Sequence, residues 1–286
     1  MARHARPRPR HQGRMMADPT RTDLSGRVAL VTGVSRRRGI GFAIAARLAE
    51  LGASLFVQHW APHDADQSYG ADDVRAVLDE LRTHLVGDAQ LSDASIDLAL
   101  DETPEQMVAS AVEAFGHVDI LVCNQARSGG DGPLLEQTPA MLDAHWRVNA
   151  RATLLATKAF AAQHDGRPGG RVIWMTSGQQ NGPMSNEIAY ATSKAGLAGV
   201  TASVADDLID RGIVLNTVNP GPVNTGYLDE GEVPEDRRQE ILAHFPHGRF
   251  GEPDDPARLI AWLASDAGRW VVGQVISTEG GFRRWG

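Results

Sequence analysis

Tyr190 and Lys194 stand four positions apart, in a stretch whose apolar spacing predicts a helix from about 188 to 211. At this spacing two side chains lie on one face of a helix, so the phenol and the amine could share a site. A tyrosine has an ordinary pKa of about 10, and acid–base work near neutrality requires roughly 4 kcal/mol of differential stabilisation, part of which an adjacent ammonium supplies. The alternative is that the two residues are ordinary surface neighbours. Lys158 is the only other lysine, and a lysine at this place in a lysine-poor chain favours a chemical role.

Two further polar residues could join this pair. Ser177 follows the predicted strand Gly-Arg-Val-Ile-Trp-Met, thirteen positions before Tyr190. A hydroxyl at such a place can donate a hydrogen bond to a substrate oxygen on which charge develops. Asn149 lies inside a long helix predicted from about 138 to 164, where it could simply face water.

A glycine-rich segment follows the first predicted strand and opens the first predicted helix. It reads Thr-Gly-Val-Ser-Arg-Arg-Arg-Gly-Ile-Gly over residues 32–41. Backbone N–H groups in such a turn can approach a pyrophosphate, and the positive end of the helix faces it. The alternative is a glycine turn without a ligand, but the strand before it and the helix after it favour a dinucleotide site. The predicted contacts from this loop are Gly33, Ser35, Arg36, Arg38, Gly39, Ile40 and Gly41.

The three arginines in this loop indicate which dinucleotide is bound. An acidic residue after the second strand commonly binds the ribose 2′-hydroxyl of NAD, whereas a basic residue accommodates the 2′-phosphate of NADP. The second predicted strand ends in Gln58, His59 and Trp60, none of which is a carboxylate. We therefore predict that NADP(H) is preferred, with Arg36 or Arg38 binding the 2′-phosphate and His59 among the cofactor contacts, while NAD(H) stays possible. For any one arginine the alternative is a solvated loop charge.

The elements that must position these residues alternate between short β-branched runs and longer helical stretches. This alternation is typical of a parallel sheet with crossover helices. It predicts one α/β domain over 24–286, a Rossmann-type doubly wound parallel sheet of about seven strands with helices on both faces. A third strand is expected around 94–100. Residues 226–250 show no clear strand and are expected to form a mobile flap over the substrate.

Composition limits the partners. The formal charge of −8 argues against a nucleic-acid binder, and no run approaches the roughly 20 apolar residues of a membrane span. Cys123 is the only cysteine, which excludes a disulfide framework or a cysteine-rich zinc site and fits the cytoplasm; we predict no metal. Residues 1–23 hold six arginines and are expected to be a disordered tail, with Met15 or Met16 as possible starts and a mitochondrial-type targeting role as a minor alternative.

Over about residues 24–286 the sequence resembles the short-chain dehydrogenase/reductase family. The resemblance rests on the glycine loop, on Ser177, on the spacing of Tyr190 and Lys194, and on the segment Asn-Pro-Gly-Pro-Val-Asn-Thr at 219–225. The stretches 248–266 and 273–281 are most similar to its 3-oxoacyl-[acyl-carrier-protein] reductase group. The resemblance implies that Tyr190 donates a proton to a substrate carbonyl whose oxygen Ser177 hydrogen-bonds. It also implies that Lys194 holds the nicotinamide ribose and favours tyrosinate, and that Asn149 anchors a proton-relay water.

The same resemblance implies further cofactor contacts and an assembly. Besides Tyr190 and Lys194, the contacts are Asp97 and Leu98 at the adenine, Asn124 in the cofactor wall, and Pro220, Gly221, Val223 and Thr225 beside the nicotinamide and phosphates. Relatives are usually tetramers or dimers, so a homo-oligomer is expected.

The sequence departs from the family pattern at three places, in the phosphate loop, beside the nicotinamide and near the C-terminus. Five residues rather than three separate Gly33 from Gly39, and the family's Asn-Asn-Ala-Gly is replaced by Cys-Asn-Gln-Ala at 123–126. Glu279 stands where Asp is common. The acidic flap would repel an acidic carrier protein, so an acyl-carrier-linked substrate is less secure than a small ketone, sugar or polyketide-like one.

The alternatives to an NADP(H)-dependent ketone reductase are an NAD-dependent alcohol or sugar dehydrogenase, a non-catalytic dinucleotide sensor, and a methyltransferase with a similar loop.

Overall fold

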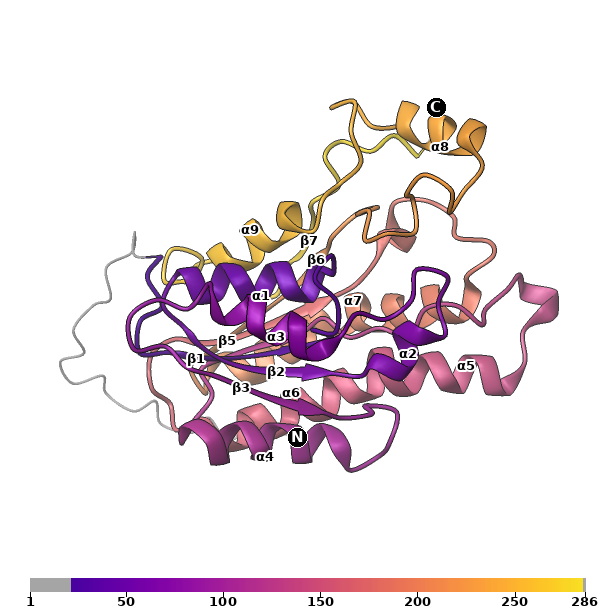
Figure 1. Cartoon of the computed structure of the whole chain (residues 1–286). Coiled ribbons are helices and arrows are strands. Elements are labelled where there is room, and N and C mark those ends of the chain that lie inside the picture. Colours follow the sequence, from indigo (N-terminus) through magenta and orange to yellow (C-terminus); the bar gives the residue numbers. More distant parts are fainter. Residues whose placement is uncertain (1–21, 285–286) are drawn as a thin grey trace, which may run out of the picture.

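Seven parallel strands form one sheet in the computed structural model, which describes residues 22–284 (Figure 1). Their spatial order is β3-β2-β1-β4-β5-β6-β7, and every neighbouring pair is parallel. The predicted seven-strand, doubly wound fold is therefore confirmed. The strands are β1 (Val28–Thr32), β2 (Ser54–His59), β3 (Leu91–Ser95), β4 (Ile120–Cys123), β5 (Gly170–Met175), β6 (Ile213–Asn219) and β7 (Val275–Ser277).

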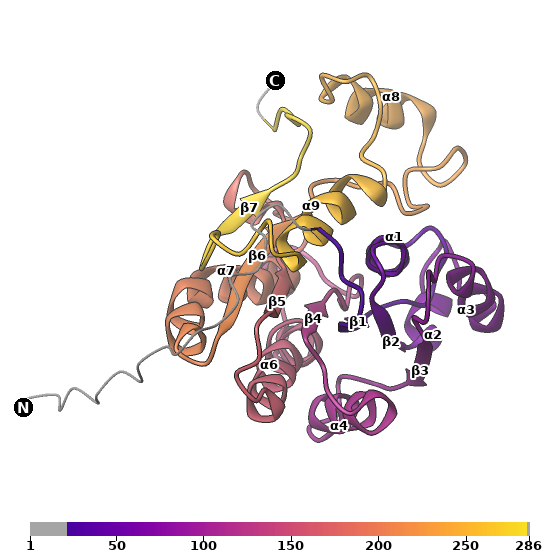
Figure 2. The same cartoon turned by 90° about the vertical axis from the view of Figure 1, so that its left-hand side faces the viewer.

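Helices cover both faces of this sheet (Figure 2). Every residue of β1, β4, β5 and β6 is buried, as expected for parallel strands with apolar layers on either side. Two hydrophobic clusters fill the two spaces between sheet and helices. One face carries α1 (Ile40–Glu50), α3 (Val74–Arg82) and α9 (Asp254–Ala264), and the other carries α4 (Thr103–Phe115), α6 (Ala152–Gln163) and α7 (Ile188–Ile209).

The long helix expected near 138–164 is present, but its middle has a different winding. It consists of α5 (Pro139–His145), the π-helical segment η2 (Trp146–Arg151) and α6 in direct succession. Single π-helical turns inside α-helices frequently lie at functional sites. Thr138 begins the helix by accepting a hydrogen bond from the backbone of Met141 at 3.2 Å.

One expectation about a single element was wrong. The third strand is Leu91–Ser95, so most of the apolar run at 94–100 is the loop that follows it. The flap at 226–250 contains a helix, α8 (Glu235–Ala243), which begins after Pro234 with two acidic residues in its first turn. Such a start favours a helix through its dipole. No residue of α8 is fully buried, and its half-buried Ile241 and Leu242 pack against the cluster of Leu228, Phe245 and Phe250. A short helix, α2 (Ala61–Ala65), was not expected.

The strand order places β1 in the interior of the sheet. From β1 the chain moves outward through β2 and β3, then returns to β4 on the other side of β1. Ligands of doubly wound sheets bind outside the carboxyl ends of the strands at this switch point. The loops after β1 and β4 are thus placed to form a site together.

Within residues 22–284, no helix combines the length and the apolar character needed to cross a membrane. Residues 1–21 of the expected N-terminal tail lie outside the described residues.

Candidate active site

Tyr190, Lys194 and Ser177 meet at the carboxyl end of the sheet. Helix α7 places the lysine one turn beyond the tyrosine, with the Lys194 Nζ atom 5.8 Å from the centroid of the Tyr190 ring. Lys194 is buried, and Nζ donates a hydrogen bond to the carbonyl oxygen of Met175 at 3.0 Å. Ser177 follows β5, and its side chain hydrogen-bonds that of Tyr190. The sequence prediction that these three residues share a site is supported by this geometry.

Burial moves the two titrating groups in opposite directions. It raises the pKa of Tyr190 to about 12, an effect that the hydrogen bond with Ser177 opposes and the charge of Glu187 reinforces. Burial lowers the pKa of Lys194 to about 8. Both shifts favour the uncharged form, as desolvation does. The expectation that the ammonium lowers the tyrosine pKa is not met, because burial dominates and the phenol keeps its proton at neutral pH.

Asn149 is completely buried in the π-helical segment, which excludes the alternative that it faces water. Its Oδ1 atom accepts a hydrogen bond from the Arg127 backbone N–H at 2.7 Å. Its Nδ2 atom donates to the Arg127 carbonyl oxygen at 3.2 Å and to Ser193 Oγ at 2.9 Å. Asn149 therefore ties the loop after β4 to helix α7.

Asp131 holds the N-terminus of helix α7, and the sequence analysis missed it. Glu187 is the residue at the cap position, but its side chain makes no capping hydrogen bond. Instead the Asp131 carboxylate accepts hydrogen bonds from the backbone N–H groups of Ala189 at 3.1 Å and Tyr190 at 2.7 Å. Burial alone would raise the pKa of Asp131, but these bonds and those from Gln137 and Gly132 lower it. The loop after β4 thus fixes the backbone of Tyr190 directly.

Replacing Asp131 by alanine is expected to lower the free energy of unfolding by about 1–2 kcal/mol, because two N–H groups of a helix start lose their acceptor. We also expect kcat to fall by about 10-fold, because the Tyr190 side chain loses its fixed position. Asp131→Asn keeps an acceptor oxygen and should restore part of both. Urea unfolding and steady-state kinetics measure these effects, with Glu187→Gln as the matched control. Equal losses in both variants would contradict the role of Asp131.

The glycine loop after β1 allows the first helix to approach the sheet closely. Gly33 has a φ of +71°, which favours glycine, and a Cβ on Gly41 would collide with the Gly33 carbonyl oxygen. The Asn124 amide donates to the carbonyl oxygens of Thr32 at 3.1 Å and Gly33 at 3.3 Å. No side chain caps the start of α1 at Gly39. Its backbone N–H groups are therefore available to a phosphate, so this loop fits a dinucleotide.

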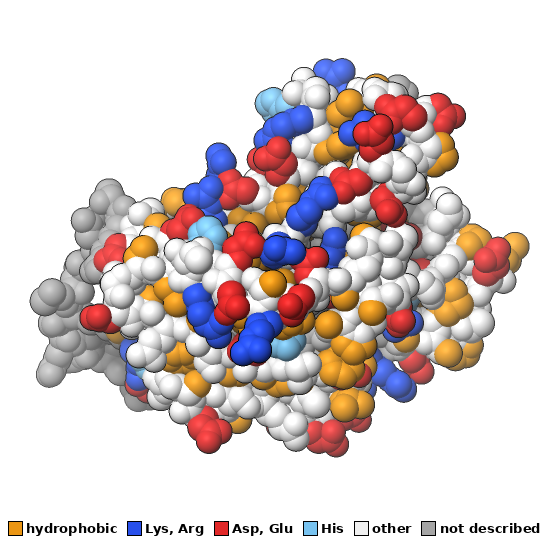
Figure 3. All heavy atoms as spheres, in the orientation of Figure 1, with side chains coloured by type: hydrophobic (Ala, Val, Ile, Leu, Met, Phe, Trp, Pro, Cys, Tyr) orange, Lys and Arg blue, Asp and Glu red, His pale blue; other side chains and the backbone are white. Residues whose placement is uncertain are grey.

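The three arginines of this loop lie in different surroundings. The Arg36 guanidinium donates to the Thr225 carbonyl oxygen at 2.5 Å and stacks on the Tyr69 ring, 3.9 Å from its centroid. Arg38 forms an ion pair with Asp229 of the flap. Arg37 lies 3.5 Å from Asp72 and 3.9 Å from Glu80. Figure 3 shows basic and acidic side chains interspersed over this face of the molecule.

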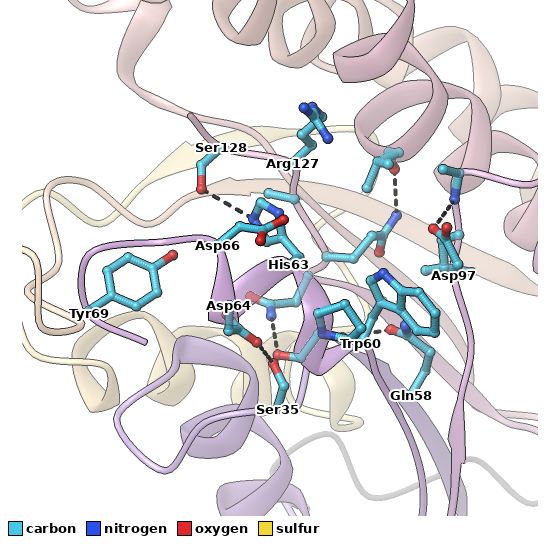
Figure 4. Close-up of a pocket in the computed structure, with 18 residues that line it drawn as sticks. Ser35, Gln58, Trp60, His63, Asp64, Asp66, Tyr69, Asp97, Arg127 and Ser128 are labelled. Carbon is cyan, nitrogen blue, oxygen red and sulfur yellow. Dashed lines mark hydrogen bonds between the residues drawn. The ribbon is translucent and has the colours of Figure 1, made fainter. Parts of the chain in front are cut away.

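A cavity of about 330 Å³ lies between the loops after β1 and β4 (Figure 4). Its volume is at the lower end of the range of about 300–1,000 Å³ for small-molecule sites. It brings together five of the predicted cofactor residues, namely Gly33, Ser35, Asp97, Leu98 and Asn124, with residues that were not predicted. The latter are Gln58, Trp60, Pro62, His63, Asp64, Asp66, Tyr69, Ala99, Gln125, Ala126, Arg127, Ser128 and Val148.

The other predicted cofactor residues do not line this cavity. His59 is buried, with Nε2 3.1 Å from the Asp93 carboxylate. Arg36, Arg38, Gly39, Ile40 and Gly41 belong to the loop and helix start beside the cavity. Pro220, Gly221, Val223 and Thr225 follow β6, where Gly221 has a φ of +73° and Val223 forms an isolated bridge with Gly251.

Gln125 explains the departure at 123–126. Its side chain points into the protein, where Oε1 accepts a hydrogen bond from Thr32 Oγ1 at 2.5 Å. Its Nε2 donates to Thr153 Oγ1 at 2.9 Å and to the Val148 carbonyl oxygen at 3.2 Å. Gln125 thus joins β1 to the π-helical segment and α6.

The sheet, its switch-point loops and the buried phenol and amine together define the class of Rossmann-type dinucleotide-dependent oxidoreductases. A family model described as enoyl-(acyl carrier protein) reductase matches residues 33–283. The chain belongs to the short-chain dehydrogenase/reductase family and is an enzyme of the kind that acts on CH–OH groups with NAD(P). The family and fold predicted from the sequence are thereby confirmed.

Two curated relatives cover nearly the whole chain. The uncharacterized oxidoreductase YjdA of Bacillus subtilis is 35% identical over 261 residues, which are 90% of this chain and 97% of that protein. The NADPH-dependent aldehyde reductase-like protein of Arabidopsis thaliana chloroplasts is 35% identical over 266 residues, 91% of this chain and 95% of that protein.

Solved structures of similar chains have the same fold. A dehydrogenase/reductase from Sinorhizobium meliloti has a TM-score of 0.78 at 33% identity, covering 92% of this chain and 97% of that chain. A metagenomic blue fluorescent protein in complex with NADPH has a TM-score of 0.75 at 34% identity, covering 91% and 99%. A 7α-hydroxysteroid dehydrogenase complexed with NADH has a TM-score of 0.79 at 27% identity, covering 94% and 99%.

Proposed function

We propose that this enzyme interconverts a ketone and a secondary alcohol and prefers NADP(H) to NAD(H). The observation that carries the proposal is the assembly of Tyr190, Ser177 and Lys194 at the carboxyl end of the sheet, beside a loop that fits a dinucleotide. A protonated phenol next to a hydroxyl is the arrangement that reduction of a carbonyl requires.

In the direction of reduction, Ser177 donates a hydrogen bond to the carbonyl oxygen of the substrate. Tyr190 then donates its proton to the same oxygen, and the C=O bond becomes CH–OH. A bound nicotinamide supplies the hydride that the carbonyl carbon receives. The Lys194 ammonium stabilises the tyrosinate that remains, and solvent restores the proton. The raised pKa keeps the Tyr190 phenol protonated at neutral pH, and release of its proton depends on the stabilisation of tyrosinate by Lys194.

For Asn149 we propose a positioning role beside its predicted part in a proton relay. Both polar atoms of its side chain are bonded to the loop after β4 and to Ser193. A water held nearby would therefore depend on the Arg127 backbone as well. The amide of Asn149 fixes that backbone with respect to α7.

The NADP(H) preference is proposed on the loop after β1. The end of β2 offers no carboxylate, since His59 stands there. Arg36 is the best candidate for the 2′-phosphate, because it directly follows Ser35, which lines the cavity. The charge of Arg38 is instead neutralised by Asp229. Asp97 and Leu98 would contact the adenine. The similar Arabidopsis protein is named NADPH-dependent, and the similar blue fluorescent protein was solved with NADPH.

Fluorescence titration of the purified protein with NADPH and NADH tests this preference. We expect NADPH to bind at least about 10-fold more tightly, a difference of about 1.4 kcal/mol. Arg36→Ala should remove that difference, while the matched control Arg37→Ala should keep it, because Arg37 faces Asp72 and Glu80. Equal affinity of the unaltered chain for both cofactors would overturn the preference, and an unchanged affinity ratio in Arg36→Ala would make Arg36 a solvated loop charge.

The substrate proposed here is a small carbonyl compound. The flap carries Asp229, Glu230, Glu232, Glu235 and Asp236, which disfavour an acidic carrier protein. An acyl-carrier-linked substrate therefore ranks second.

We further propose a homo-oligomer, dimeric or tetrameric. Large apolar side chains are exposed along α5, η2 and α7, at Leu142, Trp146 and Val200. Exposed apolar side chains on adjacent helices are typical of association surfaces.

A further inference from the structure

The segment directly after β2 lines the cavity between the loops after β1 and β4. We call residues 60–70, which include helix α2, the strap. Asp64 of the strap hydrogen-bonds Ser35 in the loop after β1. His63 lies 3.5 Å from Ser128 in the loop after β4, measured from Nε2 to Oγ. The strap therefore joins the two loops that enclose the cavity, and Figure 4 shows Asp64 directed at Ser35.

Asp64 is a buried carboxylate in this cavity, only 8% exposed. Among residues 22–284, no basic side chain forms an ion pair with it, and its hydrogen bond comes from the neutral Ser35 hydroxyl. The Asp64 carboxylate therefore has no ion-pair partner among these residues, although Arg36 stacks on Tyr69 and acts electrostatically on the same phenol as Asp64 does. Gly33, Ser35 and Asp97 share the cavity with it, from the ends of β1 and β3.

The end of β2, where an acidic residue would bind the ribose, is occupied by internal contacts. Gln58 accepts a hydrogen bond from the Gly33 N–H at 2.9 Å and donates to the Ile96 carbonyl oxygen at 2.7 Å. His59 is directed at Asp93. The Gln58 amide is thus held by the protein, and neither residue is a carboxylate, so a carboxylate for the ribose would come from another element.

We propose that Asp64 recognises the adenosine ribose and acts against Arg36 in setting the cofactor preference. A carboxylate accepts hydrogen bonds from ribose hydroxyls, as acidic residues of dinucleotide sites do. The same buried charge repels a 2′-phosphate, and this repulsion is strong where water is scarce. Asp64 thus favours NADH, Arg36 favours NADPH, and the chain's preference is the difference between the two. This inference rests on the proposed dinucleotide-dependent function.

The test is a titration of Asp64→Asn with NADPH and with NADH, followed by cofactor fluorescence and by calorimetry. We expect the ratio of the NADH Kd to the NADPH Kd to rise at least about 10-fold, because the repulsion disappears and the hydroxyl acceptor weakens. The matched control is Asp66→Asn, an exposed carboxylate of the same cavity. It should change the ratio by less than about 2-fold.

Asp64→Ser is the second variant, chosen because it keeps a polar group at the contact with Ser35. An unchanged ratio in both variants, or an equal loss of NADH and NADPH affinity, would overturn the role of Asp64. Failure of the proposed function has a different result, since the unaltered chain would then bind neither cofactor. A rise in the ratio for the Asp64 variants alone supports the proposal.

Discussion

Tyr190→Phe is expected to lower kcat by about 10³-fold while the Kd for the reduced cofactor changes little. The substitution removes one hydroxyl, which is buried and hydrogen-bonded to Ser177. The ring keeps its T-shaped contact with His145, whose ring centroid lies 6.5 Å away, so packing is preserved. Absorbance of the reduced nicotinamide during turnover of a ketone panel gives kcat, and fluorescence titration gives the Kd.

Tyr227→Phe is the matched control for this experiment. Tyr227 lies in the flap, close enough to Tyr190 to interact with it electrostatically. Loss of the Tyr227 hydroxyl should lower kcat by less than about 10-fold, because Tyr190 donates the proton. A Tyr190→Phe enzyme that retains more than a tenth of the original kcat would assign the proton transfer elsewhere.

The fold was predictable because its strands carry their signal in short, local runs. β1, β4, β5 and β6 are buried on both faces, and such strands consist almost entirely of apolar residues. β3 lies at the edge of the sheet and reads Leu-Ser-Asp-Ala-Ser, so the more apolar run after it was taken for the strand. Helix α8 has only two large apolar residues, Ile241 and Leu242, which are adjacent, and so it shows no helical periodicity.

The site was predictable only where its geometry is local in sequence. Four positions on one helix are enough to place Lys194 beside Tyr190. Asp131 contacts Tyr190 across 59 positions, and Asp64 contacts Ser35 across 29, and no periodic pattern marks either contact. The arginines show the same limit, because the carboxylate that neutralises Arg38 is 191 positions away. Charge sign is visible in a sequence, whereas the partner of a charge depends on the folded chain.

Lys194→Met is expected to stabilise the cofactor-free protein at pH 7 while abolishing activity. Burial lowers the pKa of Lys194 to about 8, so the folded state binds this proton more weakly than the unfolded state does. A shift from about 10.5 corresponds to a cost on the order of 3 kcal/mol whenever the amine is protonated in both states. The hydrogen bond to Met175 offsets part of this cost. We therefore expect the free energy of unfolding to rise by about 1–3 kcal/mol.

The pH dependence separates this explanation from better packing of methionine. Below pH 8 the amine is charged in both states, and its cost is constant. Between pH 8 and about 10.5 only the unfolded state keeps the proton, so the unaltered chain gains stability as the pH rises. The advantage of Lys194→Met should thus shrink between pH 8 and pH 10 in urea unfolding experiments.

Lys158→Met is the matched control, because Lys158 is 70% exposed and pairs with Glu105 on the surface at 2.7 Å. It should change the free energy of unfolding by less than about 1 kcal/mol at any of these pH values. A Lys194→Met protein that is less stable than the unaltered chain at pH 7 would contradict the burial cost. A stable but inactive Lys194→Met protein would mean that the lysine is present for catalysis at the expense of stability.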